Sequence, residues 1–197
     1  MARRLQQAGH TVHAWNRTQS KADPLAALGI AVHATVAEAV RQADIVVSLL
    51  ENGPAVEHVL FHAGAAQAMR PGTLFIDMAS IQPREARDHA ARLGEMGLAH
   101  LDAPVSGGTV GAENGTLAIM AGGRAEDFAR AQPVFAALGR ATHVGPHGSG
   151  QLAKLANQMI VGITIGAVAE ALLFAAKGGA DMAKVREAIQ GGFADSR

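Results

Sequence analysis

The stretch Asp44-Ile-Val-Val-Ser-Leu-Leu50 decides the fold class, because it is a nearly continuous apolar run that contains β-branched residues. Such a run is typical of a strand that is buried on both faces of a parallel sheet. Strand-like and helix-like segments alternate on both sides of it, and this alternation predicts right-handed βαβ crossovers. The sequence therefore predicts an α/β fold, with a mainly parallel sheet and helices on both of its faces.

The remaining elements are predicted from apolar periodicity and from the glycines that end helices. Further strands are expected at 11–15, 30–33, 73–77, 98–101, 117–121 and 141–144. Helices are expected at 2–8, 24–28, 36–42, 55–61, 84–96 and 125–138. From about residue 150 the pattern changes to one long apolar helix over 151–177 and a second helix over 182–190. Because so apolar a helix needs a partner layer, a helical domain is expected to begin here.

Composition excludes several classes of protein. The 17 Lys and Arg residues balance the 17 Asp and Glu residues, and without a basic run the chain lacks the charge pattern of a nucleic-acid binder. The absence of Cys removes disulfides, thiolate metal sites and cysteine nucleophiles. The uncharged stretch Leu155–Ala169 is shorter than the roughly 20 residues of a membrane span, so a buried helix is expected instead. A small-molecule partner and a cytoplasmic location fit this composition.

The segment Asn16-Arg17-Thr18 follows a predicted strand and carries a signal for a dinucleotide. At this position of a nucleotide-binding βαβ unit an acidic residue accepts hydrogen bonds from a ribose 2′-hydroxyl, whereas an Arg pairs with a 2′-phosphate. Arg17 therefore points to NADP(H), with NAD(H) as the alternative cofactor. An ordinary solvated Arg after a strand explains the same residue. The stretch Gly148-Ser-Gly150-Gln-Leu-Ala153 matches a dinucleotide turn, but no strand returns after it, so we interpret these glycines as a hinge.

Two other segments carry groups suited to chemistry. Asp102-Ala-Pro-Val-Ser-Gly-Gly108 predicts a fixed loop whose backbone N–H groups could hold a carboxylate, although most Ser-Gly-Gly turns are only turns. Lys154, Asn157 and Gln158 share one helix face by their spacing. Burial lowers the pKa of a Lys and suits it to proton exchange with a hydroxyl or carbonyl, whereas a Lys whose amine reaches water is the ordinary alternative.

A metal site is not expected. His58 and His62 are spaced so that both could bind zinc from one helix face, but no third ligand accompanies them. The sequence also lacks a G-x-S-x-G turn, so it gives no support to nucleophilic hydrolase chemistry.

Three stretches resemble the β-hydroxyacid dehydrogenases, the family that includes 3-hydroxyisobutyrate dehydrogenase and tartronate semialdehyde reductase. They are D-A-P-V-S-G-G at 102–108, G-T-L-A-I-M-A-G-G at 115–123 and G-S-G-Q-L-A-K-L-A-N-Q at 148–158, and the resemblance extends over essentially the whole chain. The K-L-A-N-Q stretch is more similar to tartronate semialdehyde (2-hydroxy-3-oxopropionate) reductases, because 3-hydroxyisobutyrate dehydrogenases more often have two Asn after the Lys.

The resemblance implies a Rossmann-like fold and an NAD(P)-dependent oxidoreductase that acts on a small β-hydroxy acid or semialdehyde acid. It implies that Lys154 is the catalytic acid/base. The substrate carboxylate and hydroxyl would be held by Ser106, Gly107, Gly108 and Asn157, with assistance from Gln158. The cofactor would be contacted by Asn16, Arg17 and Thr18 around the adenosine ribose, by Leu50 at its flank and by Ser80 near the nicotinamide ribose.

The chain also departs from the family pattern. Members begin with a strand and a G-x-G-x-x-G turn, which this sequence lacks, and they continue with a longer helical domain. We therefore expect 1–148 to form an NADP-binding domain without its first strand and glycine turn. Residues 149–197 are expected to begin a truncated helical domain for substrate binding and homo-oligomer formation. Two alternatives stay open: an inactive fragment that acts only by self-association, and an imine reductase, against which Lys154 argues.

Overall fold

The computed structural model describes residues 1–194 of the 197-residue chain. The chain divides into two compact units, Met1–Lys154 and Leu155–Arg197, which are described separately. The division falls inside helix α8 (Ser149–Lys177), whereas the sequence predicted a boundary between residues 148 and 149. That predicted boundary stays a prediction, and residues 195–197 of the predicted helical domain lie outside the described residues.

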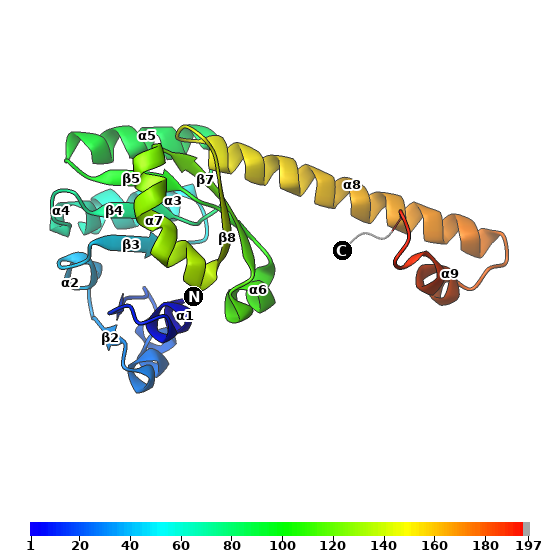
Figure 1. The fold of residues 1–197 in the computed structure, drawn as a ribbon, viewed down its shortest axis with the longest axis horizontal. Helices are drawn as coiled ribbons and strands as arrows, with labels where there is room; N and C mark the ends of the chain where they lie inside the picture. The colour runs from blue at the N-terminus through cyan, green and yellow to red at the C-terminus, as the bar shows by residue number, and fades with distance from the viewer. Residues whose placement is uncertain (195–197) are drawn as a thin grey trace. The chain divides into compact units, whose positions relative to one another are not determined.

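The first unit is built on a six-stranded sheet, of which β3, β4, β5, β7 and β8 are labelled in Figure 1. Its strands are β3 (Ile45–Ser48), β4 (Leu74–Asp77), β5 (Ala99–Asp102), β6 (Val105–Ser106), β7 (Leu117–Gly123) and β8 (Gly139–Gly145). The order is β3-β4-β5-β7-β6, and β8 also pairs with β7. The pairs β3/β4, β4/β5 and β7/β8 are parallel, whereas β7 runs antiparallel to β5 and β6. The expected mainly parallel sheet is confirmed, with a reversal at β7.

Two short strands form a separate sheet. β1 (His13–Ala14) and β2 (Ala31–Val32) pair in parallel, and within residues 1–194 they pair only with each other. Trp15 directly follows β1 and packs, partly buried, against the core cluster described below. The sequence predicted longer strands at both places, because apolar alternation does not reveal where pairing stops.

Helices and single helical turns connect the strands. The α-helices of the first unit are α1 (Ala2–Gln7), α2 (Val36–Val40), α3 (Gly53–Glu57), α4 (Ala65–Ala68), α5 (Pro83–Glu95), α6 (Gly108–Asn114), α7 (Ala125–Leu138) and the start of α8. The 3₁₀ segments are η1 (Gln19–Lys21) and η2 (Asp23–Leu28), and η3 (His58–His62) is a π-helical turn. The helix predicted at 24–28 is thus a 3₁₀ helix, and the one predicted at 55–61 combines α3 with η3. α2 begins at a capping box in which Thr35 and Glu38 satisfy each other's backbone N–H groups.

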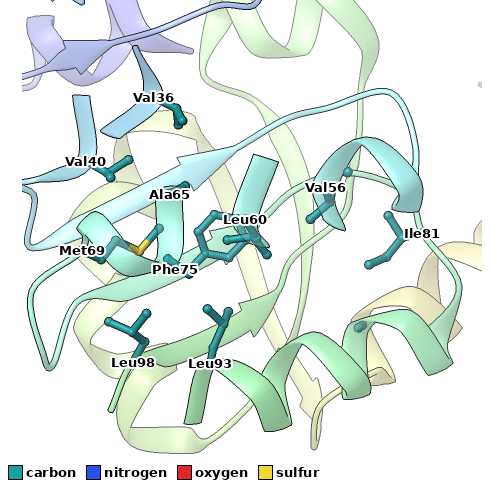
Figure 2. Packing of buried hydrophobic residues seen from close by; sticks show 13 residues of the cluster. Val36, Val40, Val56, Leu60, Ala65, Met69, Phe75, Ile81, Leu93 and Leu98 are labelled. Atoms are coloured by element: carbon teal, nitrogen blue, oxygen red, sulfur yellow. The ribbon is translucent and has the colours of Figure 1, made fainter. Parts of the chain in front are cut away.

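Side chains of β4 alternate between two hydrophobic clusters, one on each face of the sheet. Phe75 belongs to the first core cluster, which is drawn in Figure 2, where it lies close to Leu60 and Leu93. Leu74 and Ile76 belong to the other cluster, which α7 covers with Phe135 among others. All four residues of β4 are buried. Helices on both faces of the sheet are therefore confirmed, and the carboxyl end of β4 is held rigidly between two packed layers.

The strand predicted as buried on both faces is less enclosed than expected. All four residues of β3 are only half-buried. The reason is its place in the sheet, because β3 ends the strand order and has β4 as its only neighbour in the sheet among the described residues. An apolar run in the sequence cannot distinguish a central strand from an end strand.

The second unit contains the rest of α8, and α9 (Met182–Ile189), which Asp181 caps by accepting from Ala183 N and Lys184 N. The expectation that the apolar helix is buried is wrong within this unit, because Met159 is 66% and Phe174 81% exposed. Only α9 accompanies it among the described residues, and one short helix cannot cover so much apolar surface. By length and composition alone, α8 is also the one described helix able to cross a membrane, properties that core helices of soluble proteins share.

Candidate active site

Lys154 lies in the second turn of α8, and its amine reaches the strand that carries Ser106. Nζ donates a hydrogen bond to the carbonyl oxygen of Val105, at 2.8 Å. The side chain is half-buried, and this burial lowers the pKa of the amine from its ordinary value. The structure therefore brings Lys154 beside the backbone that leads into Ser106, Gly107 and Gly108.

The segment 102–108 is more ordered than the loop that the sequence predicted. Val105 and Ser106 form β6, in which Ser106 pairs with Ala118 of β7, and α6 begins at Gly108. Gly107 has a φ of 132°, and a Cβ at this position would lie 3.2 Å from Leu117 Cδ2. The prediction of a loop failed because the pairing partner of β6 lies at a distance in the sequence, whereas Ser-Gly-Gly is a local turn signal.

The other two polar residues predicted on this helix, Asn157 and Gln158, lie on α8 within the second unit. Asn157 Nδ2 donates to Gln158 Oε1 at 3.0 Å. Asn157 is half-buried and Gln158 is exposed. Their contribution to a substrate site stays a prediction.

The residues predicted to contact a cofactor follow three strands. After β1, Asn16 Oδ1 accepts from Thr18 N at 2.9 Å, which forms a tight turn around the exposed Arg17. Leu50 follows β3 and packs against the first core cluster, and Ser80 follows β4 and is exposed. In open α/β sheets, ligands bind outside the carboxyl ends of the strands, which is where these residues lie.

Two buried polar atoms at the same strand ends have no hydrogen-bond partner within the described part of the chain. They are Ser48 Oγ at the end of β3 and Asp77 Oδ2 at the end of β4, and the two residues are neighbours in the strand register. Burial raises the pKa of the Asp77 carboxyl to about 7, and the nearby Asp102 adds to this shift. A hydroxyl and a carboxyl that both lack partners fit the hydroxyl-rich and amide-rich surface of a nicotinamide nucleotide.

Two residues that sequence reasoning assigned no role occupy the buried centre of the first unit. Both carboxylate oxygens of Asp102 accept backbone N–H groups, Oδ1 from Gly148 at 2.7 Å and Oδ2 from Gln151 at 3.0 Å. Burial raises the pKa of Asp102. The Gln151 side chain in turn contacts the segment after β4. Both residues lie inside the stretches that carry the family resemblance. The one signal that could have indicated their structural role is a polar side chain among mostly small and apolar neighbours.

The glycines at the start of α8 serve close packing. Gly150 is buried, and a Cβ there would lie 2.3 Å from the carbonyl oxygen of Asp102 and 2.4 Å from that of Met120. Gly148 has a φ of 87°, a conformation that favours glycine. Gly150 in particular lets α8 start directly against β5 and β7, and the hinge that the sequence suggested at these glycines stays a prediction.

Of the two histidines rejected as zinc ligands, His62 lies beside an ion-pair cluster and His58 stacks on His62. The rings of His58 and His62 stack with centroids 5.9 Å apart. The Glu57 carboxylate lies 2.7 Å from Arg92 Nη1 and 3.1 Å from His89 Nε2. It also lies 3.8 Å from His62 Nε2. Within residues 1–194, no group of three or more His, Cys, Asp or Glu side chains is arranged to hold a metal ion.

Comparison with known proteins identifies the family. Residues 1–146 match the NAD-binding domain of 6-phosphogluconate dehydrogenase, and residues 148–197 match the NAD-binding domain of NADP-dependent 3-hydroxyisobutyrate dehydrogenase. A 2-hydroxy-3-oxopropionate reductase of Escherichia coli (strain K12) is 45% identical over 199 residues, covering 100% of this chain and 68% of the relative. The chain belongs to the β-hydroxyacid dehydrogenase family.

Other relatives in the β-hydroxyacid dehydrogenase family differ in cofactor and substrate. An NAD-dependent L-serine dehydrogenase of Pseudomonas aeruginosa is 39% identical, over 96% of this chain and 64% of the relative. The solved 3-hydroxyisobutyrate dehydrogenase of Mycobacterium tuberculosis with L-serine has a TM-score of 0.91 and 36% identity, covering 99% of this chain and 67% of that one. The chain thus spans about two thirds of the length of these β-hydroxyacid dehydrogenases.

The fold extends to imine reductases. The imine reductase from Myxococcus stipitatus in complex with NADP⁺ has a TM-score of 0.84 and 26% identity, over 96% of this chain and 66% of that one. The β-hydroxyacid dehydrogenase relatives named above are the more similar in sequence, as the three motifs predicted.

Proposed function

We propose that the protein is an NADP(H)-preferring reductase of a small semialdehyde acid of the 2-hydroxy-3-oxopropionate type, which also oxidises the corresponding β-hydroxy acid. The 3-hydroxyisobutyrate type is the second candidate substrate. The observation that carries the proposal is the hydrogen bond of 2.8 Å from Lys154 Nζ to the Val105 carbonyl. It supports an acid/base amine beside Ser106, Gly107 and Gly108.

Lys154 would act as the proton donor. When bound, NADPH supplies a hydride to the carbonyl carbon of the semialdehyde. Lys154 Nζ gives a proton to the carbonyl oxygen, so that the aldehyde becomes a hydroxyl and the amine recovers its proton from water. The lowered pKa of this half-buried amine makes that proton easier to release. In the oxidation direction the neutral amine takes the proton back.

The remaining site residues would hold the two reactants in place. Ser106, Gly107, Gly108 and Asn157 would bind the substrate carboxylate and hydroxyl, with assistance from Gln158. The cofactor would be held at the strand ends by Asn16, Arg17, Thr18, Leu50 and Ser80. The exposure of Arg17 and Ser80 after β1 and β4, and the partnerless atoms of Ser48 and Asp77, support this assignment.

The same proposal covers partners and location. The exposed apolar side chains of α8 support self-association into a homo-oligomer through residues 149–197. The balanced charge supports a small-molecule partner rather than nucleic acid, and the composition supports a cytoplasmic location. The second candidate function is a catalytically inactive chain that acts only by self-association, and the same exposed helix favours it.

A cofactor-dependent assay tests the proposal. The purified protein is incubated with NADPH or NADH and tartronate semialdehyde, and in the reverse direction with 3-hydroxyisobutyrate or L-serine. We expect oxidation of NADPH that depends on the semialdehyde, and slower turnover with NADH. Saturable NADPH binding without turnover of any of these acids would contradict the proposed reaction, and no binding of either cofactor would favour the inactive chain.

Replacing Arg17 by alanine is expected to weaken NADPH binding and to leave NADH binding almost unchanged. A charge-assisted hydrogen bond to a phosphate contributes about 1.5–3 kcal/mol, so the Kd of NADPH should rise about 10- to 100-fold. The measurement is a fluorescence titration with each cofactor. Arg41→Ala, which removes an exposed Arg at the end of α2, is the matched control. An equal loss of affinity for both cofactors would show that Arg17 does not read the 2′-phosphate.

A further inference from the structure

Gln151 uses both ends of its side-chain amide to hold the segment that follows β4. Its Oε1 accepts from Ile81 N at 3.1 Å, and its Nε2 donates to the carbonyl oxygen of Ala79 at 2.9 Å. The residue between these two contacts is the exposed Ser80. Gln151 is only 1% exposed, so water does not compete for these bonds. The backbone on both sides of Ser80 is therefore fixed by one side chain.

Asp102 fixes the backbone from which that side chain projects. Its carboxylate accepts from Gly148 N and from Gln151 N, the free N–H groups at the start of α8. A Cβ at Gly150 would lie 2.3 Å from the carbonyl oxygen of Asp102, so the start of α8 packs closely against β5. Gln151 is consequently held from two sides, by β5 at its backbone and by the segment after β4 at its amide.

Gln151 also lies three residues before Lys154 on the same helix, so the two side chains project from the same face of its first turns. Lys154 is held in turn by the Val105 carbonyl. Contacts of Gln151, Asp102 and Lys154 thus connect the Ser80 segment, the start of α8 and β6. Ala79 N donates a hydrogen bond to Asp77 Oδ1 at 3.0 Å, and this bond fixes the start of the Ser80 segment.

We propose that Gln151 is a positioning residue that sets the distance and orientation between the Ser80 segment and the turn of α8 that carries Lys154. The inference rests on the proposed function, in which Ser80 contacts the nicotinamide ribose and Lys154 contacts the substrate. Hydride and proton transfer need both reactants in near-attack geometry, and a displacement of about 1 Å costs about 10²-fold in rate. Gln151 itself touches neither reactant and acts through the two backbone segments.

The test is Gln151→Met, which keeps the length of the side chain and removes both hydrogen bonds to the Ser80 segment. We expect kcat for the semialdehyde to fall by about 10- to 100-fold, with the KM of the substrate and the Kd of NADPH changed by less than about threefold. Hydride transfer should also become more rate-limiting, so the isotope effect with NADPH deuterated at the transferred position should rise. A uniform loss of folded protein would lower the apparent kcat and leave the isotope effect unchanged.

Two further measurements need neither substrate nor turnover. Hydrogen exchange of the Ile81 amide should become faster in Gln151→Met. The pKa of Lys154, followed by NMR of labelled lysine side chains and assigned with Lys154→Ala, should move upward toward its ordinary value as water reaches the start of α8. Gln67→Met changes an exposed glutamine on α4 in the same way and should alter neither quantity.

A second variant covers the case in which Gln151→Met does not fold. Gln151→Glu keeps an acceptor for Ile81 N and removes the donor to Ala79, so it should show the same changes at reduced size. An unchanged Ile81 exchange rate and an unchanged Lys154 pKa in these variants would overturn the inference. If the unsubstituted protein has no turnover, the proposed function fails, and the two ligand-free measurements still decide whether Gln151 links the two segments.

Discussion

Replacing Lys154 by alanine is expected to lower kcat by about 10²- to 10⁴-fold, the usual contribution of a positioned acid/base group. The amine proposed to give its proton to the carbonyl oxygen is lost, whereas the strand ends proposed to hold the cofactor are untouched. The Kd of NADPH should therefore change little. Steady-state kinetics and a fluorescence titration with the same preparation measure both quantities.

The matched control for this substitution is Lys177→Ala, because Lys177 is an exposed lysine at the other end of the same helix. Its kcat should stay within about twofold of the unsubstituted protein, as for most surface changes. Turnover retained in Lys154→Ala would remove Lys154 from the role of proton donor. If Lys154→Ala loses both NADPH binding and turnover, Lys154 has a structural role instead.

Replacing Asp77 by asparagine is expected to stabilise the protein at alkaline pH. The folded-state pKa of about 7 lies above the ordinary value of 3.8, so the folded protein holds a proton that the unfolded chain releases. The stability that comes from this proton is complete below pH 3.8, is lost as pH rises from 3.8 to about 7, and does not fall further above that. Asparagine is neutral throughout and should escape this loss.

Urea unfolding at pH 5 and at pH 8 measures the effect. Between these two pH values the unsubstituted protein should lose about 3 kcal/mol more stability than Asp77→Asn, since each pKa unit corresponds to about 1.4 kcal/mol. Comparing the two proteins cancels the contribution of every group that they share. Asp23→Asn, at an exposed carboxylate, should keep the loss of the unsubstituted protein. Equal losses for Asp77→Asn and the unsubstituted protein would show that Asp77 is ionised when folded.

The elements that the sequence located best are those whose signals are local. The predicted range 125–138 is the observed α7, because apolar periodicity and the following Gly139 define both of its ends. By contrast, the sequence did not predict β6, which lies inside the predicted loop 102–108, or α6, which begins at the end of that loop. The strand at Val105–Ser106 exists through its pairing with β7, and such a contact between distant segments leaves no local pattern. The same reason explains why the half-buried state of β3 was not foreseen.

The candidate site was located through motifs rather than through geometry. The sequence indicated Lys154 and Ser106 separately, and the structure adds that the Lys154 amine reaches the carbonyl of Val105. Asp102 and Gln151 received no role because their partners are far along the chain. Gly148 and Gln151 follow Asp102 by 46 and 49 residues. Asp102 is a buried carboxylate on a strand that caps a helix distant in the sequence, and such a cap can be recognised only when the fold is known.

Trp15, which follows β1 and packs against the first core cluster, makes the proposed cofactor site observable without any label. It is the only tryptophan of the chain, and the chain has no tyrosine, so all tryptophan emission comes from this single place. Its neighbour Asn16 begins the turn around Arg17. A change in emission on adding NADPH would therefore report occupancy at the adenosine end, while the fluorescence of the nicotinamide itself reports the other end. Tryptophan emission and nicotinamide fluorescence together would distinguish a cofactor bound along its whole length from one bound only by its adenosine half.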